Sequence, residues 1–191
     1  MKVTKEEAAR HRAALIEAAG RLFRERGFEG VSLAEISKAA GLTHGAFYGH
    51  FTSKEDLAAQ ACGQVLDNVA ANWRRVCEAE GPRALGTIAS AYLSSRHRDN
   101  PGEGCPFATL GQDIARQEAP VRGAVTRGLR GILAILGPLF PGKTEAARKQ
   151  KALAAYASLV GAMVLARSVE DPHLSEEILR SVAASLPLSP E

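Results

Sequence analysis

The chain has 191 residues, of which 46% are hydrophobic and 24% are charged, so it can bury one sizeable core or build a small head on a larger body. Its longest nearly unbroken apolar run, residues 152–166, is shorter than the roughly 20 residues that a membrane-spanning helix needs. The first residues lack the apolar segment of a signal peptide, and three cysteines, an odd number, suit a reducing compartment, so we expect a cytoplasmic protein without a membrane span.

The net charge of +3 is unevenly distributed along the chain. Residues 1–54 contain nine basic and six acidic residues, whereas residues 55–191 contain fifteen of each. The first part of the chain therefore carries the whole positive excess, which would attract the phosphates of a nucleic acid. An excess this small can also arise by chance.

The first expected helix runs from Thr4 to Gly27. Thr4 and Glu7 have the spacing of a capping box, and Gly27 can act as the C-terminal stop. Between these signals, apolar residues repeat at helical spacing and should form one buried stripe. The residues of this stripe are Leu15, Ala18, Ala19, Leu22 and Phe23.

A helix, a glycine turn and a short helix follow, which is the pattern of a helix-turn-helix. Ser32 and Glu35 form a second capping-box pattern, and Gly41 can end the helix that they start. Thr43 can then cap a short helix over residues 44–50. In a helix-turn-helix, this second helix enters the major groove of DNA.

The short helix over residues 44–50 cannot bury all of its aromatic side chains, so at least one of them must face outward. We assign Leu42, Phe47 and Phe51 to the core, which leaves the other side of the helix for DNA. The expected DNA-binding residues are Thr43, His44, Gly45, Ala46, Tyr48, His50 and Lys54.

These residues have different expected roles on DNA. His44 and Ala46 would read base edges, because imidazole can donate or accept a hydrogen bond and a methyl group can contact the thymine methyl. Gly45 removes a side chain where the helix backbone would come close to the duplex.

Tyr48, His50 and Lys54 are expected to bind phosphates, and Lys54 would do so in the first turn of the next helix, where free N–H groups favour an anion. The alternatives are a partly buried core aromatic for Tyr48 and an ordinary surface histidine for His50.

The segment resembles the DNA-binding signature of the TetR/AcrR family of bacterial transcriptional regulators, through the pattern Thr43-x-Gly45-x-Phe47-Tyr48-x-His50-Phe51-x-x-Lys54-x-x-Leu57. The resemblance covers about the first third of the chain; the remainder is similar to the family only in its helical layout and its ending. It implies a regulator that binds an operator near a promoter.

A long helix is expected from its cap at Ser53 to about Glu80, where a Gly-Pro pair stops it. Such a helix would be about 40 Å long at 1.5 Å per residue, so it could link the DNA-reading head mechanically to the rest of the protein. A further helix over residues 84–98 and a turn over residues 99–102 should follow.

Cys105 and Pro106 are expected to begin the next helix, because proline is favoured at the first helical position. A thiol at the N-terminus of a helix can be reactive. A structural role, or a place in the wall of a pocket, is the simpler interpretation of Cys105. The alternative is a repressor that senses electrophiles or oxidants through this thiol.

Residues 137–144 match the phosphate-binding pattern GxxxxGK[ST] letter for letter. A phosphate-binding loop follows a strand, whereas the residues before Gly137 have helical periodicity. Pro138 and Pro141 also remove two N–H donors from the loop. We interpret the segment as a helix stop, a turn and a cap at Thr144, with a nucleotide-binding enzyme as the remote alternative.

Two more helices end the chain before an expected tail over residues 187–191. The helix over residues 145–168 is apolar nearly all round between residues 152 and 166, so it needs neighbours on all sides. The last helix is expected to begin at Ser175. In so small a body one face of this pair should be left for a second copy, which predicts a homodimer through the last two helices, as the resemblance also implies.

The sequence therefore predicts an all-α protein of about nine helices, with a helix-turn-helix head over residues 1–52 and an effector-binding and dimerisation body over residues 53–191. No catalytic constellation, metal-ligand spacing or cofactor motif is apparent. A dimer would bind a palindromic operator in double-stranded DNA and block transcription until a small apolar or aromatic effector releases it. The candidate pocket residues are Trp73, Tyr92, Cys105, Phe107, Leu110 and Tyr156.

Overall fold

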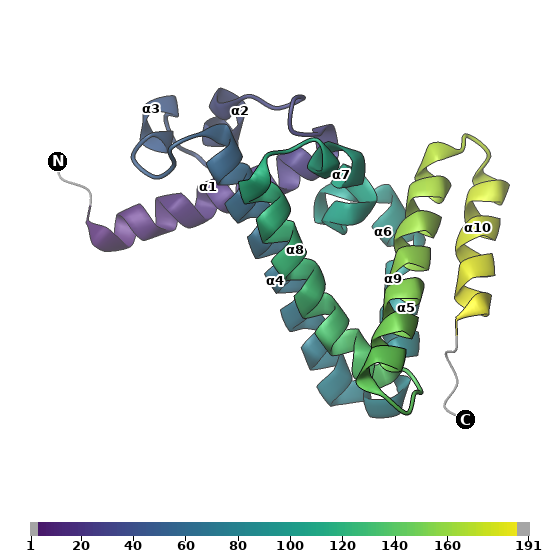
Figure 1. The fold of residues 1–191 in the computed structure, drawn as a ribbon. Helices are drawn as coiled ribbons and strands as arrows, with labels where there is room; N and C mark the ends of the chain where they lie inside the picture. The colour runs from purple at the N-terminus through teal and green to yellow at the C-terminus, as the bar shows by residue number, and fades with distance from the viewer. Residues whose placement is uncertain (1–3, 187–191) are drawn as a thin grey trace.

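The computed structural model describes residues 4–186, and within this range the chain forms ten α-helices, three short 3-10 helices and no strand (Figure 1). This confirms the all-α prediction. Within the same range, no helix is long and apolar enough to cross a membrane. The expected tail over residues 187–191 lies outside the described residues.

The first four helices carry the helix-turn-helix and the long connection that leaves it. They are α1 (Lys5–Arg26), α2 (Leu33–Ala39), α3 (His44–Phe47) and α4 (Lys54–Glu80). The remaining elements are η1 (Gly81–Arg83), α5 (Ala84–Tyr92), α6 (Ser95–Asp99), η2 (Pro101–Glu103), α7 (Pro106–Ala115), α8 (Ala119–Leu136), η3 (Gly137–Leu139), α9 (Glu145–Ser168) and α10 (Pro172–Ser185).

Local capping signals place the ends of α1 as predicted. The Thr4 side chain accepts a hydrogen bond from the Glu7 backbone N–H at 3.2 Å, and the Glu7 carboxylate accepts one from the Thr4 N–H at 2.9 Å. Gly27 ends the helix with a φ of 76°, a conformation that favours glycine. The predicted apolar stripe of α1 is buried and packs with α2, α3 and α4 in the core of the head.

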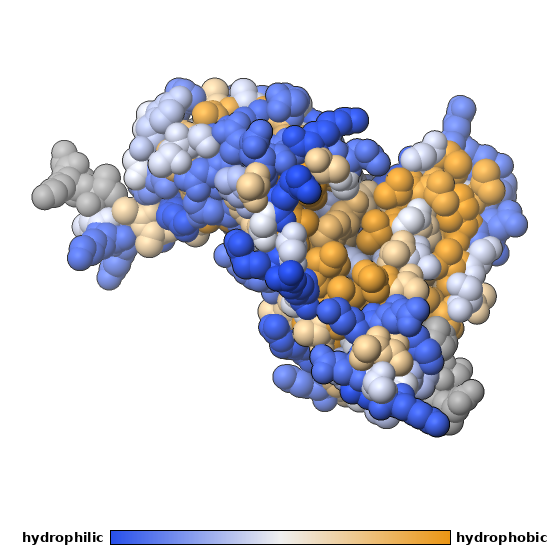
Figure 2. Space-filling model, viewed as in Figure 1, coloured by the Kyte–Doolittle hydropathy of each residue, from blue (hydrophilic) through white to orange (hydrophobic). Residues whose placement is uncertain are grey.

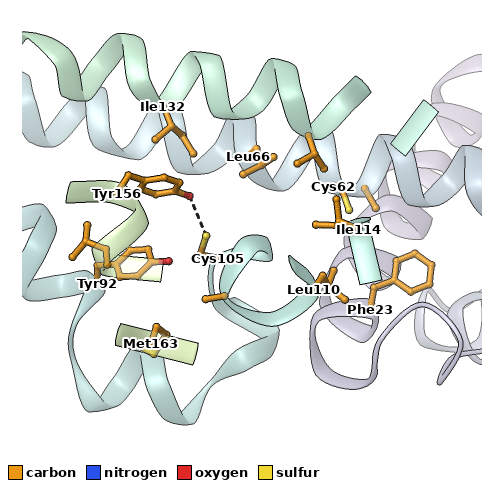
Figure 3. Packing of buried hydrophobic residues seen from close by; sticks show 14 of the residues in the cluster. Phe23, Cys62, Leu66, Tyr92, Cys105, Leu110, Ile114, Ile132, Tyr156 and Met163 are labelled. Carbon is orange, nitrogen blue, oxygen red and sulfur yellow. Dashed lines mark hydrogen bonds between the residues drawn. The ribbon is translucent and has the colours of Figure 1, made fainter. Parts of the chain in front are cut away.

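Helix α4 runs from the head to the opposite end of the molecule, and α8 lies along it (Figure 1). The two helices approach closely where Gly128 of α8 faces Leu66 of α4. A Cβ atom on Gly128 would lie 2.6 Å from the Leu66 Cβ atom, so this contact requires glycine. Figure 3 shows Leu66 in the interior between the head and the body, with Ile132 of α8 nearby.

Helix α3 is shorter than predicted. It ends at Phe47, whereas the sequence predicted an end at His50. Gly49 is a poor helix former, and the backbone after Phe47 closes in a turn, in which the His50 N–H donates to the Phe47 carbonyl at 2.9 Å. The expected helix over residues 84–98 is divided into α5 and α6. It divides at Ser94, whose hydroxyl donates to the Ala91 carbonyl at 2.8 Å and accepts from the His97 N–H.

The predicted start of the last helix at Ser175 is wrong. Helix α10 begins three residues earlier, because Asp171 accepts a hydrogen bond from the His173 N–H at 2.8 Å and Pro172 takes the first helical position. The Ser175 side chain is buried and donates to the Ala166 carbonyl at 2.7 Å, so it ties α10 to α9.

Helix α9 is not buried on all sides within the single chain, which agrees with the expectation that the last two helices leave one face uncovered. Elements α6, α7, α8 and α10 contact it, but they leave one side open, where Leu153 is 48%, Val164 41% and Leu165 57% exposed. Leu174 of α10 is also exposed. Figure 2 shows hydrophobic residues gathered over α9 and α10 on the face in view.

Candidate nucleic-acid interface and ligand cavity

Helix α3 and the turn after it present most of the predicted DNA-binding side chains to solvent. Tyr48 is 63% exposed, and its ring meets the exposed His44 ring edge-on, with 5.5 Å between the ring centroids. Phe47 between them is fully buried and stacks on Phe51. The exposure of Tyr48 excludes the alternative of a core aromatic.

Gly45 lies in open space on the same helix. A Cβ atom there would meet no atom within 4 Å, so packing inside the chain does not require a glycine. Thr43 is also exposed and its side chain makes no capping hydrogen bond, while Ala46 is half-buried. The side chains at Thr43, Gly45 and Ala46 are small, so another molecule can come close to the helix backbone there.

His50 and Lys54 are both half-buried at the edge of this surface. The His50 ring lies 6.3 Å from the His11 ring of α1, and burial lowers the pKa of His50, as do the charges of His11 and Arg12. A neutral imidazole can donate one hydrogen bond to a phosphate but adds no charge.

Lys54 begins α4, where some of the free N–H groups are already satisfied. The Ser53 hydroxyl accepts from the Asp56 N–H at 3.1 Å, and Glu55 and Asp56 add negative charge to this turn. The Lys54 ammonium is therefore the positive group that this helix start offers to a phosphate.

A cavity of about 150 Å³ lies in the body, between α4, α5 and the segment from α6 to the start of α7. The lining residues are Val69, Trp73, Ile88, Ala91, Tyr92, His97, Glu103, Gly104 and Cys105. Three of the six predicted pocket residues, Trp73, Tyr92 and Cys105, are among them. A larger hollow of about 320 Å³ opens at the far end of α8, among Arg130, Arg148 and Lys149, and has none of the six in its wall.

The other predicted pocket residues lie behind this wall or away from it. The Tyr156 ring meets both the Trp73 and the Phe107 ring edge-on, at centroid distances of 6.0 Å. Leu110 lies beside Phe23 and Cys62, closer to the head. The effector role of all six residues stays a prediction.

Two buried tyrosine hydroxyls approach Cys105, and only one of them has a partner (Figure 3). The Tyr156 hydroxyl lies 3.2 Å from the Cys105 sulfur, whereas the Tyr92 hydroxyl has no hydrogen-bond partner among the described residues. Burial raises the pKa of both phenols, so both stay protonated. The Cys105 side chain itself is buried.

His97 supports the cavity wall through both nitrogens of its ring. Its Nδ1 donates to the Tyr92 carbonyl at 2.7 Å, which leaves Nε2 to accept from the Cys105 N–H at 3.0 Å. This arrangement requires the neutral ring, and burial, with a smaller effect of Arg167, lowers the pKa of His97. Gly104 gives the ring room, because a Cβ atom there would lie 2.7 Å from Nε2.

The cavity wall is also joined to the head. Arg24 near the end of α1 donates through Nε and Nη2 to the Gly102 carbonyl of η2, with 3.0 Å from Nε to the oxygen. Gly102 directly precedes the lining residues Glu103 to Cys105. Sequence reasoning singled out neither Arg24 nor His97 for this site.

The segment that matches GxxxxGK[ST] does not have the setting of a phosphate-binding loop. Helix α8 leads directly into η3 at Gly137, so the GxxxxGK[ST] match follows a helix, and Thr144 caps α9 by accepting from the Ala147 N–H at 3.1 Å. Between residues 4 and 186, no three His, Cys, Asp or Glu side chains gather where they could hold a metal ion. The interpretation of residues 137–144 as a stop, a turn and a cap is confirmed.

Comparison with known proteins points to one family. Residues 15–61 match the family model of the bacterial regulatory proteins, tetR family. The chain is 52% identical over 54 residues to the HTH-type transcriptional regulator TtgR of Pseudomonas putida, a match that covers 28% of this chain and 26% of TtgR. It is 34% identical over 84 residues to the HTH-type transcriptional repressor KstR2 of Rhodococcus jostii, covering 44% of this chain and 41% of KstR2.

The sequence matches thus span about a quarter to two fifths of those relatives. The fold extends the similarity to nearly the whole chain. A TetR-family transcriptional regulator from Agrobacterium tumefaciens superposes with a TM-score of 0.77 at 19% identity, over 94% of this chain and 98% of that one.

Proposed function

We propose that this protein is a DNA-binding transcriptional regulator, because residues 15–61 match the family model of the bacterial regulatory proteins, tetR family, and nearly the whole chain has the fold of a solved TetR-family regulator. The observation that carries the proposal is the outer side of α3. There Tyr48 is 63% exposed beside a glycine that no packing contact requires. His44 and Ala46 would read base edges, and Thr43, Tyr48, His50 and Lys54 would position the helix on the phosphates.

We propose that the protein binds DNA as a homodimer through α9 and α10. Leu153, Val164 and Leu165 are exposed apolar side chains of α9, and Leu174 is one of α10. Figure 2 shows hydrophobic residues gathered over these two helices. A second copy of the same face would cover them around a twofold axis. Gly161 lies between them with no atom within 4 Å of a Cβ, which leaves room for a helix of the second copy to approach.

A twofold dimer places two copies of α3 in related orientations. For a helix-turn-helix dimer this geometry corresponds to two half-sites about 34 Å apart, so the operator should be palindromic. Binding at a promoter would exclude the transcription machinery, which makes the protein a repressor. The name of KstR2, a repressor, is in keeping with this proposal.

The cavity beside Trp73 is the proposed effector site. Trp73 lies on α4, and α4 begins in the head at Lys54, so a change in the cavity wall can move the head. To release the operator about a hundredfold, the effector must prefer the released conformation by about 2.7 kcal/mol, summed over both sites.

A selection of bound sequences from random DNA tests the function. The wild type should enrich a palindrome, and Tyr48→Ala and Lys54→Ala should each weaken binding to all sequences. Lys54→Ala should also reduce the salt slope by about 1, whereas Tyr48→Ala removes no charge and should leave the slope unchanged. His44→Ala should instead change the preferred bases. The exposed Lys149→Ala, on α9, serves as the matched control and should behave as the wild type. A purified protein without preference for any duplex at low salt would refute the proposal.

A further inference from the structure

The hollow of about 320 Å³ between the end of α8 and the start of α9 has no part in the proposed function. Its volume lies at the lower end of the range for small-molecule sites, roughly 300–1,000 Å³. Figure 1 shows the connection between these two helices at the opposite end of the molecule from α3. The hollow also shares no lining residue with the cavity beside Trp73, so it is a separate place on the protein.

Part of the wall of this hollow is apolar. Leu133, Ala134 and Pro138 supply aliphatic groups at the end of α8 and the start of η3. An apolar part of a ligand would leave water on contact with them, at about 25 cal/mol for each Å² that is buried.

The charged groups of the wall leave a positive excess. They are Arg130, Glu145, Arg148 and Lys149. Between residues 4 and 186, none of these four takes part in an ion pair. Three cations against one carboxylate give the wall a net charge of +2, and the cations repel one another. An anion in the hollow would relieve this repulsion.

Arg148 is held in place across the turn that precedes α9. Its Nη1 donates to the Gly142 carbonyl at 3.0 Å, and its side chain is half-buried. A Cβ atom on Gly142 would lie 2.9 Å from the Arg148 Cγ atom, so glycine at this position gives the arginine room. Within the described range, Nε and Nη2 of Arg148 have no hydrogen-bond partner and stay available to an anion. The second glycine of the GxxxxGK[ST] match thus has a structural role without a nucleotide.

We propose that the hollow binds a small amphipathic organic anion. The apolar part of the anion packs on Leu133 and Pro138. Its anionic oxygens accept hydrogen bonds from Arg148 and Arg130, because a guanidinium group presents two parallel donors to a phosphate or carboxylate. A neutral molecule would leave the cations without a counter-ion, and a cation would be repelled. This site is additional to the proposed effector cavity, and its occupation does not depend on DNA.

Three probes separate the charge from the apolar contact. Phenyl phosphate carries an anion and a ring, inorganic phosphate carries the anion alone, and benzyl alcohol is an uncharged ring of similar size. Ligand-observed NMR titrations of the full-length protein at about pH 7.5, where a phosphate monoester is close to a dianion, give the dissociation constants. Phenyl phosphate should bind at least about tenfold more tightly than either of the others. Its affinity should fall as salt is added, because salt screens the charges.

Charge variants of opposite sign locate the anion. Arg130→Gln and Arg148→Gln should each weaken phenyl phosphate binding roughly three- to tenfold, because each removes a charged donor. Glu145→Gln should strengthen binding by up to about threefold, because it removes the carboxylate that repels the anion. Arg130 and Glu145 are exposed, so neither change disturbs the core. Arg122→Gln is the matched control, since Arg122 is exposed on the same helix outside the hollow, and it should bind as the wild type.

Four results would each overturn the inference. Equal losses in Arg122→Gln and Arg130→Gln would mean a general attraction of anions to the protein. Phenyl phosphate that binds no tighter than inorganic phosphate would remove the apolar contact, and unchanged binding in Glu145→Gln would place the anion elsewhere. Weaker self-association of Arg130→Gln in sedimentation would show that carboxylates of a second copy occupy the hollow.

The outcomes are independent of the proposed function. Absence of any DNA preference would refute the regulator and leave this site in place, and failure of the probes to bind would do the reverse. The DNA selection contains no organic anion, so occupation of the hollow does not affect its Lys149→Ala control.

Discussion

His97 illustrates how one residue can tie several segments together through backbone groups. Its ring joins the Tyr92 carbonyl at the end of α5 to the Cys105 N–H at the start of α7. Protonation of Nε2 would place an N–H opposite the Cys105 N–H and break this bond. The link is therefore sensitive to acid.

We predict that acid weakens the fold through His97. Its pKa is lowered below the ordinary value of 6.5, so the unfolded chain binds more protons as the pH falls through about 6.5, and the free energy of unfolding decreases there. One such group contributes a slope of at most about 1.4 kcal/mol per pH unit. Urea unfolding between about pH 7.5 and 5.5 measures this slope, and His97→Gln should reduce it.

His173→Gln is the matched control, because the ring of His173 is exposed and makes no hydrogen bond within residues 4–186. It should reproduce the wild-type slope; an equal slope in His97→Gln would contradict the prediction. Glu35, whose pKa is lowered to about 2 chiefly by hydrogen bonds from Ser32, loses its stabilising effect only as the pH falls through about 4.5 toward 2, below the window of His97.

Residues of the head could be placed from the sequence, and those of the cavity wall only in part. Tyr48 and Phe47 followed from the length of a short helix, which cannot bury both. His97 and Arg24 could not be found in this way, because their partners are backbone carbonyls and N–H groups, which every residue type supplies. No side-chain pattern marks such contacts.

At the scale of helices, the close approach of α4 and α8 depends on a small residue at one point. Gly128 faces Leu66, while Gly131, one turn further along α8, has no atom within 4 Å of a Cβ position. The two glycines therefore share a helix but differ in what an added methyl group would meet.

We predict opposite effects of alanine at these two glycines. Gly131→Ala should raise the free energy of unfolding by up to about 1 kcal/mol, because alanine is the better helix former. Gly128→Ala gains the same propensity but forces α4 and α8 apart, and it should be less stable than Gly131→Ala by about 1–3 kcal/mol. Chemical denaturation of both variants measures the difference. Equal stabilities would mean that the contact between α4 and α8 yields without cost.

Helix ends were predictable where one side chain caps them. Thr4, Ser32, Ser53 and Thr144 each bind the N–H that their spacing indicated. The division at Ser94 was missed, because a serine within a segment of helical apolar spacing gives no sign that the helix ends there. The uncovered face of the last two helices was expected from the small size of the body, but composition alone does not say which residues of α9 lie on it.

The molecule as a whole leaves one apolar face uncovered. The exposed leucines and valine of α9 and α10 lie on the body, away from the DNA-reading surface of α3 (Figures 1 and 2). A face of this kind in a protein of this size is the expected site of association with a second copy.

We predict that a charge at Leu165 disrupts the dimer. Leu165 is the most exposed of these side chains, at 57%, and Leu165→Glu would place carboxylates in an apolar interface, which should weaken self-association at least about tenfold. Sedimentation at several protein concentrations measures the association. Tyr48→Ala removes an exposed aromatic outside this face and should sediment as the wild type. A wild-type monomer, or a Leu165→Glu variant that still dimerises, would contradict the prediction.

Helix α4 is a single uninterrupted element of 27 residues, so a small rotation at one end becomes a translation at the other. Over its length of about 40 Å, a tilt of about 5° displaces the far end by roughly 3.5 Å, close to the 3.4 Å rise of one base pair. In a symmetric dimer the two copies of α3 would shift in opposite directions, so the distance between them would change by about two base-pair steps. A ligand that tilts α4 in this way would move the two copies of α3 out of register with the major grooves of the operator.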